Sequence, residues 1–131
     1  MNLLALLFGK KVQKSRLNYD ALRLVEEKWP FIEQELKLAK PSNLKQAVID
    51  ADKVTDFVLK QLYPERETMG ERLKLAKEKF FNYRNEYNDL WYAHKIRNEL
   101  VHNPRFNLPS VEVSSIIAKF ARGLEILGAK R

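Results

Sequence analysis

The sequence of 131 residues contains no cysteine, and it has only four glycines and five prolines. Without cysteine the chain can form no disulfide bond and no thiolate metal site, and it has no thiol nucleophile. A chain of this kind suits a reducing compartment, so we expect a cytoplasmic protein. The few prolines and glycines fall mostly between periodic segments, which favours a helical protein with short connections.

Long apolar runs are also missing. The run at residues 3–8 is much shorter than the roughly 20 residues that a membrane-spanning helix needs. No basic residue precedes this run and no small-residue cleavage site follows it, so we expect no cleaved signal peptide. We interpret residues 1–16 as an N-terminal arm that packs on its own domain or on a second subunit. The alternative is contact with a membrane surface, with residues 3–8 in the lipid and four basic side chains on the headgroups: Lys10, Lys11, Lys14 and Arg16.

The composition is that of one globular domain, which we place at residues 17–131. Apolar residues make up 45% of the chain and charged residues 31%, as in ordinary folded proteins. Lysine and arginine number 24 against 17 aspartates and glutamates, which gives a net charge of +7. This excess favours anionic partners, with nucleic acid first and anionic membrane surfaces second.

Apolar residues recur at the three- and four-residue steps of a helix, and no segment alternates with the period of two that a strand requires. The pattern predicts helices at residues 18–39 and 44–62, a loop at residues 63–70, and a helix that stops before residues 82–85. Further helices are expected at about residues 86–101 and up to residue 127, the last with Ser110 as its N-cap. Pro30 should kink or break the first helix. The predicted fold is all-α, an antiparallel up-and-down bundle of four to five helices.

The same spacing predicts which faces are buried. In the first helix the face consists of Tyr19, Leu22, Val25 and Trp29. In the second it consists of Leu44, Ala47, Val48, Ala51, Val54, Val58 and Leu62, and in the last of Val113, Ile116, Ile117, Phe120, Leu124 and Leu127.

Asp52 and Asp56 lie one turn apart on the second predicted helix. Paired carboxylates can form a metal site or an acid–base site. Because Lys53 and Lys60 accompany them on the same helix, we interpret the pair as a solvated face with ion pairs inside the helix.

Arg97 breaks the apolar pattern of the helix that ends before Pro104. At 100° per residue it points near the middle of an apolar arc formed by Leu90, Ala93, Ile96, Leu100 and Val101. A guanidinium cannot lose its proton, and burying it unpaired is costly. Arg97 therefore needs water, a charged partner or an anion.

His94, Asn98 and His102 follow at four-residue steps beside Arg97 and form a polar strip. This grouping fits metal-free cleavage of RNA, because a histidine can take the proton of a ribose 2′-hydroxyl or give one to the leaving 5′-oxygen. Arg97 can hold the phosphate, Asn98 can orient either group, and the ring of His102 can swing toward Arg97 at the helix end. One histidine cannot easily serve as both base and acid, so we expect two copies to meet across a two-fold axis.

The same residues have a structural interpretation, which the pattern alone slightly favours. Arg97 could pair with an acidic group such as Asp52 or Asp56. His102 would interact favourably with the macrodipole at the C-terminal end of its helix. His94 would then be a structural or exposed side chain.

Residues 90–103 resemble the R-N-x-x-x-H segment of HEPN domains, with the motif itself at residues 97–102. Residues 47–54 look like the second helix of a bacterial HEPN-like group, and residues 69–73 look like the start of its next helix. The resemblance covers about residues 40–127. It implies an all-α bundle that dimerises and brings two motifs into one cleft. HEPN toxins that pair with nucleotidyltransferase antitoxins usually carry a tyrosine two positions after the histidine, where this chain has Pro104.

Many HEPN proteins are metal-independent endoribonucleases that act as toxins or in RNA-guided defence, and others are binding or scaffolding modules. The resemblance implies that Arg97 and His102 are the catalytic pair and that Asn98 supports them. Three further side chains around the motif are the candidate substrate-binding residues: His94, Lys95 and Arg105.

We therefore predict a homodimeric endoribonuclease that acts on RNA and uses no metal or cofactor. An antitoxin or a defence protein is a candidate further partner. The alternatives are a non-catalytic module that binds RNA or nucleotides, and a purely structural dimerisation domain in which Arg97 holds the interface.

Overall fold

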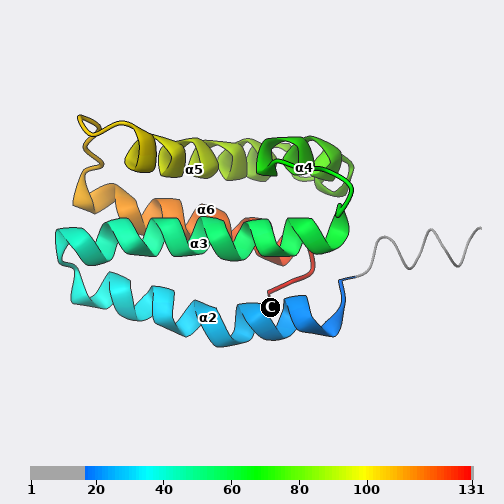
Figure 1. The fold of residues 1–131 in the computed structure, drawn as a ribbon, viewed down its shortest axis with the longest axis horizontal. Helices are drawn as coiled ribbons and strands as arrows, with labels where there is room; N and C mark the ends of the chain where they lie inside the picture. The colour runs from blue at the N-terminus through cyan, green and yellow to red at the C-terminus, as the bar shows by residue number, and fades with distance from the viewer. Residues whose placement is uncertain (1–16, 131) are drawn as a thin grey trace, which may run out of the picture.

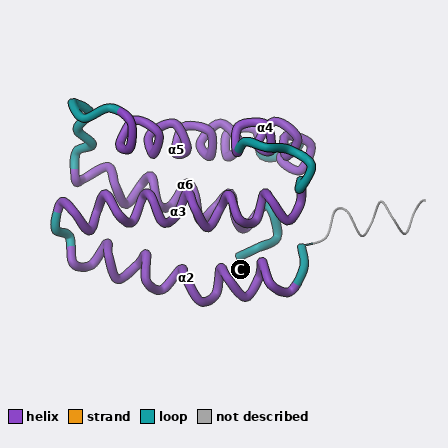
Figure 2. Tube along the Cα trace, in the orientation of Figure 1, coloured by secondary structure: helices purple, strands orange, loops and turns teal. Residues whose placement is uncertain are grey.

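The computed structural model describes residues 17–130, and most of them are helical (Figure 1). The elements in chain order are α2 (Tyr19–Leu38), α3 (Pro41–Leu62), α4 (Met69–Ala76), a 3-10 helix (Lys77–Phe80), α5 (Arg84–His102) and α6 (Ser110–Ile126). Figure 2 shows these helices joined by short loops, with no strand in the described part of the chain. The prediction of an all-α helical bundle is confirmed.

Both interpretations of the N-terminal arm, packing on the protein and membrane contact through residues 3–8, fall on residues 1–16, which lie outside the described residues. Between residues 17 and 130, no helix combines the length and the apolar character that are needed to cross a bilayer.

Helix α3 lies at the centre of the bundle and contacts each of the other four described α-helices. In Figure 1, α2 lies along one side of α3 and α5 lies on the opposite side, while α6 packs against both α3 and α5. After α6 the chain returns toward α2, where Ala129 is buried and Lys130 Nζ lies 5.5 Å from the centre of the Trp29 ring. Polar side chains on several faces of α3 are therefore brought against other helices.

Local signals in the sequence set the helix ends. The Asn18 side chain accepts a hydrogen bond from a backbone N–H of the first turn of α2, at 3.0 Å. Ala39 ends α2 in the left-handed conformation, with φ of 56°, and Pro41 begins α3. Thr68 caps α4 by accepting from the N–H of Glu71 at 3.1 Å. These caps satisfy backbone groups that the helices leave unpaired.

The buried faces predicted for α3 and α6 are confirmed, and their residues form the core together with those of α5. The face predicted for α2 is partly wrong. Val25 and Trp29 are buried, but Tyr19 is 73% exposed and Leu22 is 36% exposed. Because α2 is covered mainly by α3, only a narrow stripe of it is buried, and Ala21 is the residue of that stripe in the first turn.

Two further predictions about the helices are corrected. The break expected at Pro30 is absent, because α2 continues through this residue from Tyr19 to Leu38. Pro30 is exposed, so the carbonyl that loses its amide partner can bind water. Ser110 is not the N-cap of α6, because Pro109 takes that position with φ of −56° and ψ of 136°. Ser110 is already the first helical residue, and its side chain forms no capping bond.

Candidate functional site

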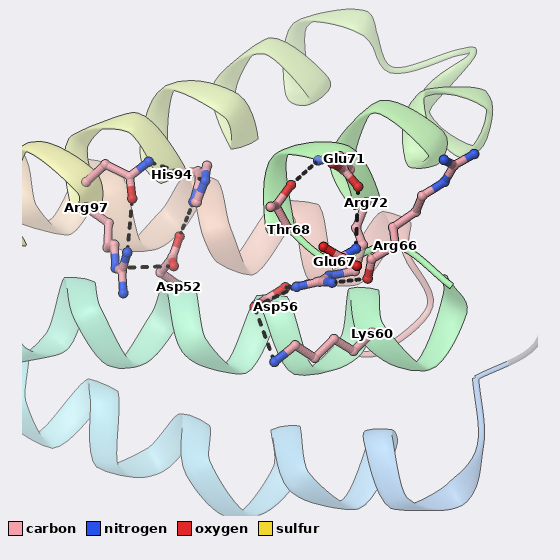
Figure 3. Close-up of polar contacts among 11 residues, drawn as sticks. Asp52, Asp56, Lys60, Arg66, Glu67, Thr68, Glu71, Arg72, His94 and Arg97 are labelled. Atoms are coloured by element: carbon pink, nitrogen blue, oxygen red, sulfur yellow. Dashed lines mark hydrogen bonds and ion pairs between the residues drawn. The ribbon is translucent and has the colours of Figure 1, made fainter. Parts of the chain in front are cut away.

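Four polar side chains form a closed ring between α3 and α5 (Figure 3). His94 Nδ1 lies 2.7 Å from Asp52 Oδ1, and Arg97 Nε lies 3.5 Å from Asp52 Oδ2. Asn98 closes the ring, because its Oδ1 accepts from Arg97 Nη1 at 3.0 Å and its Nδ2 lies 3.4 Å from His94 Nε2. We call these four residues, Asp52, His94, Arg97 and Asn98, the Asp52 ring.

Asp52 is the centre of this ring and is only 4% exposed. Its interpretation as part of a solvated face is wrong, because α5 covers α3 on this side. A carboxylate that is removed from water needs charged or hydrogen-bonding partners, and His94 and Arg97 supply them. The ion pair between Arg97 and Asp52 is one of the two pairings that the structural interpretation of the sequence anticipated.

His94 is buried inside the bundle, with 8% of the residue exposed. A carboxylate oxygen accepts hydrogen bonds, so Nδ1 carries the hydrogen and donates it to Asp52. Nε2 then accepts from the Asn98 amide. The Trp91 ring packs edge-on beside the imidazole, with ring centres 6.2 Å apart. His94 therefore lies beneath the surface, where it orients Asp52 and Asn98.

Arg97 is held at two of its nitrogens and unpaired at the third. Its side chain is 31% exposed, although Nε is buried and makes only the ion pair with Asp52. Nη1 is occupied by Asn98, and Nη2 makes no hydrogen bond with any residue from 17 to 130. The apolar arc around it is narrower than predicted, because Val101 is 43% exposed. An oriented guanidinium with an unpaired Nη2 is well placed to bind an anion.

The other candidate residues do not join the ring. His102 is the last residue of α5 and is exposed. Within the described chain it makes no hydrogen bond or ion pair, and the expected swing of its ring toward Arg97 does not produce a contact. Lys95 is exposed, with Nζ 5.7 Å from the centre of the Trp91 ring, and Arg105 is exposed in the loop after α5. The structure thus brings together Arg97, Asn98 and His94, and leaves the remaining candidates at the surface.

A second polar cluster, which was not predicted from the sequence, lies further along α3 (Figure 3). Arg72 of α4 is 3% exposed, and its Nε donates to Asp56 Oδ1 at 3.0 Å. Its Nη1 donates to the backbone carbonyl of Arg66 at 2.6 Å. We call Asp56, Arg66 and Arg72 the Asp56 clamp. The expected pair within α3 also exists, but it is longer, with Lys60 Nζ 3.8 Å from Asp56.

The sequence did contain a signal for the Asp56 clamp. Arg72 follows Met69 by three residues and precedes Ala76 by four, and all three are buried on one face of α4. It is thus a charged residue in an apolar stripe, as Arg97 is, and the same reasoning would have found it.

No group of three or more histidine, aspartate and glutamate side chains in residues 17–130 is arranged to hold a metal ion. Comparison with known proteins gives no match either. No protein-family model matches the chain, and no curated protein or solved structure does. The Asp52 ring and the motif at residues 97–102 are therefore the basis for assigning a function.

Proposed function

We propose that the protein is a metal-independent endoribonuclease of the HEPN type. In this proposal the helices form an antiparallel up-and-down bundle, and two copies pair so that their residues 97–102 face one cleft. The enzyme acts on RNA in the cytoplasm, and an antitoxin or a defence protein that binds over the cleft would regulate it.

The observation that carries the proposal is the state of Arg97. Asp52 and Asn98 engage Nε and Nη1 of the guanidinium, Nη2 has no partner in the described chain, and nearly a third of the side chain remains exposed. A backbone phosphate can accept a charge-assisted hydrogen bond from this nitrogen. The net charge of +7 adds a general attraction for RNA.

The reaction follows from the groups that the cleft would hold. The imidazole of His102 from one copy accepts the proton of a ribose 2′-hydroxyl, and the 2′-oxygen attacks the adjacent phosphorus. The bond from phosphorus to the 5′-oxygen breaks, and that oxygen receives a proton from His102 of the other copy. Arg97 stabilises the negative charge that builds up on the phosphate oxygens. The products are a 2′,3′-cyclic phosphate and a 5′-hydroxyl.

Asp52, His94 and Asn98 act by positioning Arg97 rather than by touching RNA. Because each is hydrogen-bonded or ion-paired inside the ring, the guanidinium needs little reorganisation when the phosphate arrives. His94 thus moves from the substrate-binding group to the supporting group in this proposal.

One observation favours a second candidate, a non-catalytic module that binds RNA or nucleotides. His94 has Asp52 to fix its tautomer, whereas His102 has no such partner among residues 17–130. A catalytic histidine is usually oriented by a third group. Without a group that orients His102, the Arg97 guanidinium would bind RNA and leave it intact.

The test is incubation of the purified protein with mixed RNA in the presence of EDTA. We expect cleavage, with 2′,3′-cyclic phosphate ends detected by mass spectrometry. His102→Ala should slow it by about 100-fold or more, since acid–base groups contribute on that order. The matched control is Arg84→Ala, which removes an exposed arginine at the other end of α5.

The outcomes separate the two candidates. No cleavage, together with salt-sensitive RNA binding that Arg97→Ala weakens, would support the binding module. Cleavage that His102→Ala leaves unchanged would exclude the proposed chemistry. A protein with no RNA or nucleotide affinity at low salt would exclude both.

A further inference from the structure

A hollow of about 480 Å³ lies at the end of the bundle where α5 finishes. Its walls come from the start of α3, the last turn of α5, residues 103–109 and the first turn of α6. The volume is within the range of about 300–1,000 Å³ that is usual for ligand pockets.

The lining of this hollow combines apolar and polar side chains. Apolar side chains line it, among them Leu44, Leu100 and Phe106, and polar groups such as Lys45 and Asn107 complete the lining. No acidic residue lines it. Half-buried Phe106 also packs against the core of the bundle, so its ring is held in place. An apolar wall with an aromatic ring and a few amides suits a flat, polar ring system.

The wall after α5 is formed by a closed turn. Asn103 Oδ1 accepts from the backbone N–H of Arg105 at 3.1 Å, and the Asn103 carbonyl accepts from the N–H of Phe106 at 3.0 Å. The Asn103 amide in turn donates to Glu99 on α5 at 3.1 Å. The hollow is therefore preformed, and a ligand would not have to order this segment.

The hollow lies at the same end of α5 as the motif at residues 97–102. Asn103, which lines it, directly follows His102, and Leu100 lies one turn beyond Arg97 on α5. A nucleotide whose phosphate is bound by Arg97 would thus have a base-sized hollow at the same end of the helix. The larger hollow, of about 550 Å³, lies between α2 and α3, and none of its lining residues belongs to α5, which carries Arg97.

We propose that the hollow at the end of α5 is a nucleobase subsite that gives the enzyme a preference for one base next to the cleaved bond. This inference rests on the proposed function, because the RNA backbone must be held at Arg97. The base packs against the Phe106 ring, the Asn107 amide reads its hydrogen-bonding edge, and Lys45 attracts the adjoining phosphate.

The experiment measures binding apart from cleavage. Fluorescent oligonucleotides with 2′-O-methyl groups lack the attacking hydroxyl, so they bind without being cut. Four homopolymers, one for each base, are titrated with the full-length protein and followed by anisotropy. We expect the wild-type protein to bind one of them at least tenfold more tightly than the weakest.

Two variants test the hollow, and two others serve as controls. Phe106→Ala should lower the affinity for the preferred oligonucleotide by roughly tenfold, which is the usual loss when a stacking ring is removed. Asn107→Ala, in an exposed loop position, should leave the fold intact and reduce the difference between bases. Phe81→Ala and Asn85→Ala change exposed residues of the same types near the other end of α5. They should change neither the affinity for the preferred oligonucleotide nor the difference in affinity between bases.

The outcomes distinguish this inference from the proposed function. RNA binding or cleavage whose base preference survives both Phe106→Ala and Asn107→Ala would overturn the subsite and leave the function standing. The protein could bind one homopolymer preferentially without cleaving RNA. If Asn107→Ala then removed that preference, the subsite would be supported and the nuclease excluded. Equal binding of all four homopolymers by the wild-type protein would overturn the subsite.

Discussion

Two aspartates of α3, one turn apart, each pair with an arginine from a different helix, yet the two pairs are built differently. In the Asp56 clamp, Arg72 is 3% exposed and donates to Asp56 twice, at 3.0 and 3.3 Å, as well as to a backbone carbonyl. In the Asp52 ring, the Arg97 side chain is 31% exposed, and its nearest approach to Asp52 is 3.5 Å. The first arginine has its hydrogen-bonding capacity largely used, and the second keeps part of it for solvent or a ligand.

The difference teaches how a buried arginine can be assigned a role. Burial alone does not mark a site, since Arg72 is the more deeply buried of the two and holds α4 against α3. The informative feature is a guanidinium that the protein orients through two nitrogens and leaves unpaired at the third. Arg97 has this feature, so we place the proposed site there and assign a structural role to Arg72.

The largest expected effect is the loss of stability in Arg72→Ala. Removing this buried guanidinium takes two hydrogen bonds from Asp56 and the donor from the Arg66 carbonyl, although Asp56 is partly exposed and keeps Lys60 at 3.8 Å. The cost should be about 3 kcal/mol in the free energy of unfolding, the lower end for a broken buried pair. Arg97→Ala should cost only about 1 kcal/mol, because its pair is partly exposed and Asp52 keeps His94. Urea denaturation followed by circular dichroism measures both values.

A double substitution checks the reason for that difference. Replacing both clamp partners, as Arg72→Met with Asp56→Leu, should recover much of the lost stability, since no unpaired charge remains. Equal losses in Arg72→Ala and Arg97→Ala would contradict the comparison. If Arg97→Leu also left a folded protein that bound RNA as the wild-type protein does, Arg97 would be structural and the proposed site would be wrong.

Asp52→Ala comes next in magnitude. It takes the acceptor from a buried imidazole N–H and the charge from Arg97, so we expect a loss of about 1–3 kcal/mol. Asp52→Asn keeps an oxygen that can accept from His94, and it should cost less. Both variants should weaken RNA binding, because Arg97 is no longer oriented. Unchanged RNA binding in folded Asp52→Ala would show that the ring has no part in function.

Much of the fold could be predicted from residue spacing. The faces of α3 and α6 are broad and well covered, so their apolar residues at three- and four-residue steps indicated the buried positions correctly. The face of α2 could not be derived in this way, because packing mainly against α3 buries only a narrow stripe and leaves Tyr19 and Leu22 exposed. Spacing records which residues share a face, whereas exposure depends on which neighbour covers it.

The site could be predicted only in part for the same reason. Arg97 stood out because a charge in an apolar arc conflicts with its surroundings. The burial of Asp52 and its contact with His94 join residues 42 positions apart, and nothing in the local pattern of α3 indicates which of its polar faces α5 covers. His102 was expected to turn toward Arg97, but within one chain the end of α5 leaves it in solvent.

A smaller effect is expected at the helix that carries Arg72. Thr68 caps α4 through the N–H of Glu71, and Thr68→Ala should lower stability by about 1 kcal/mol. If the cap supports the Asp56 clamp, the losses in Thr68→Ala and Arg72→Ala should not add in the double variant. Full additivity in urea denaturation would show that the cap and the clamp act independently.

The smallest effect concerns a third carboxylate of α3, Asp50, which faces Glu35 of α2 without an intervening arginine. Burial, followed by the nearby Asp50, raises the pKa of Glu35 to about 7 from its usual 4.5, and Glu35 Oε2 is buried without a hydrogen-bond partner in the described chain. Between about pH 4.5 and 7 the folded protein therefore retains a proton that the unfolded chain has released. Stability should fall as the pH rises through this window, because the folded state binds more protons there.

Glu35→Gln replaces the titrating group with a neutral one and should abolish that loss. We expect the variant to match the wild-type protein near pH 4.5 and to have the higher urea midpoint at pH 8. Partial exposure of Glu35 to solvent keeps the difference modest. The control is Glu33→Gln, an exposed residue on the same helix, which should follow the wild-type pH dependence. Parallel curves for Glu35→Gln and the wild-type protein would show that the proton on Glu35 does not account for the pH dependence, and that the carboxylates of Glu35 and Asp50 do not destabilise the packing of α2 on α3.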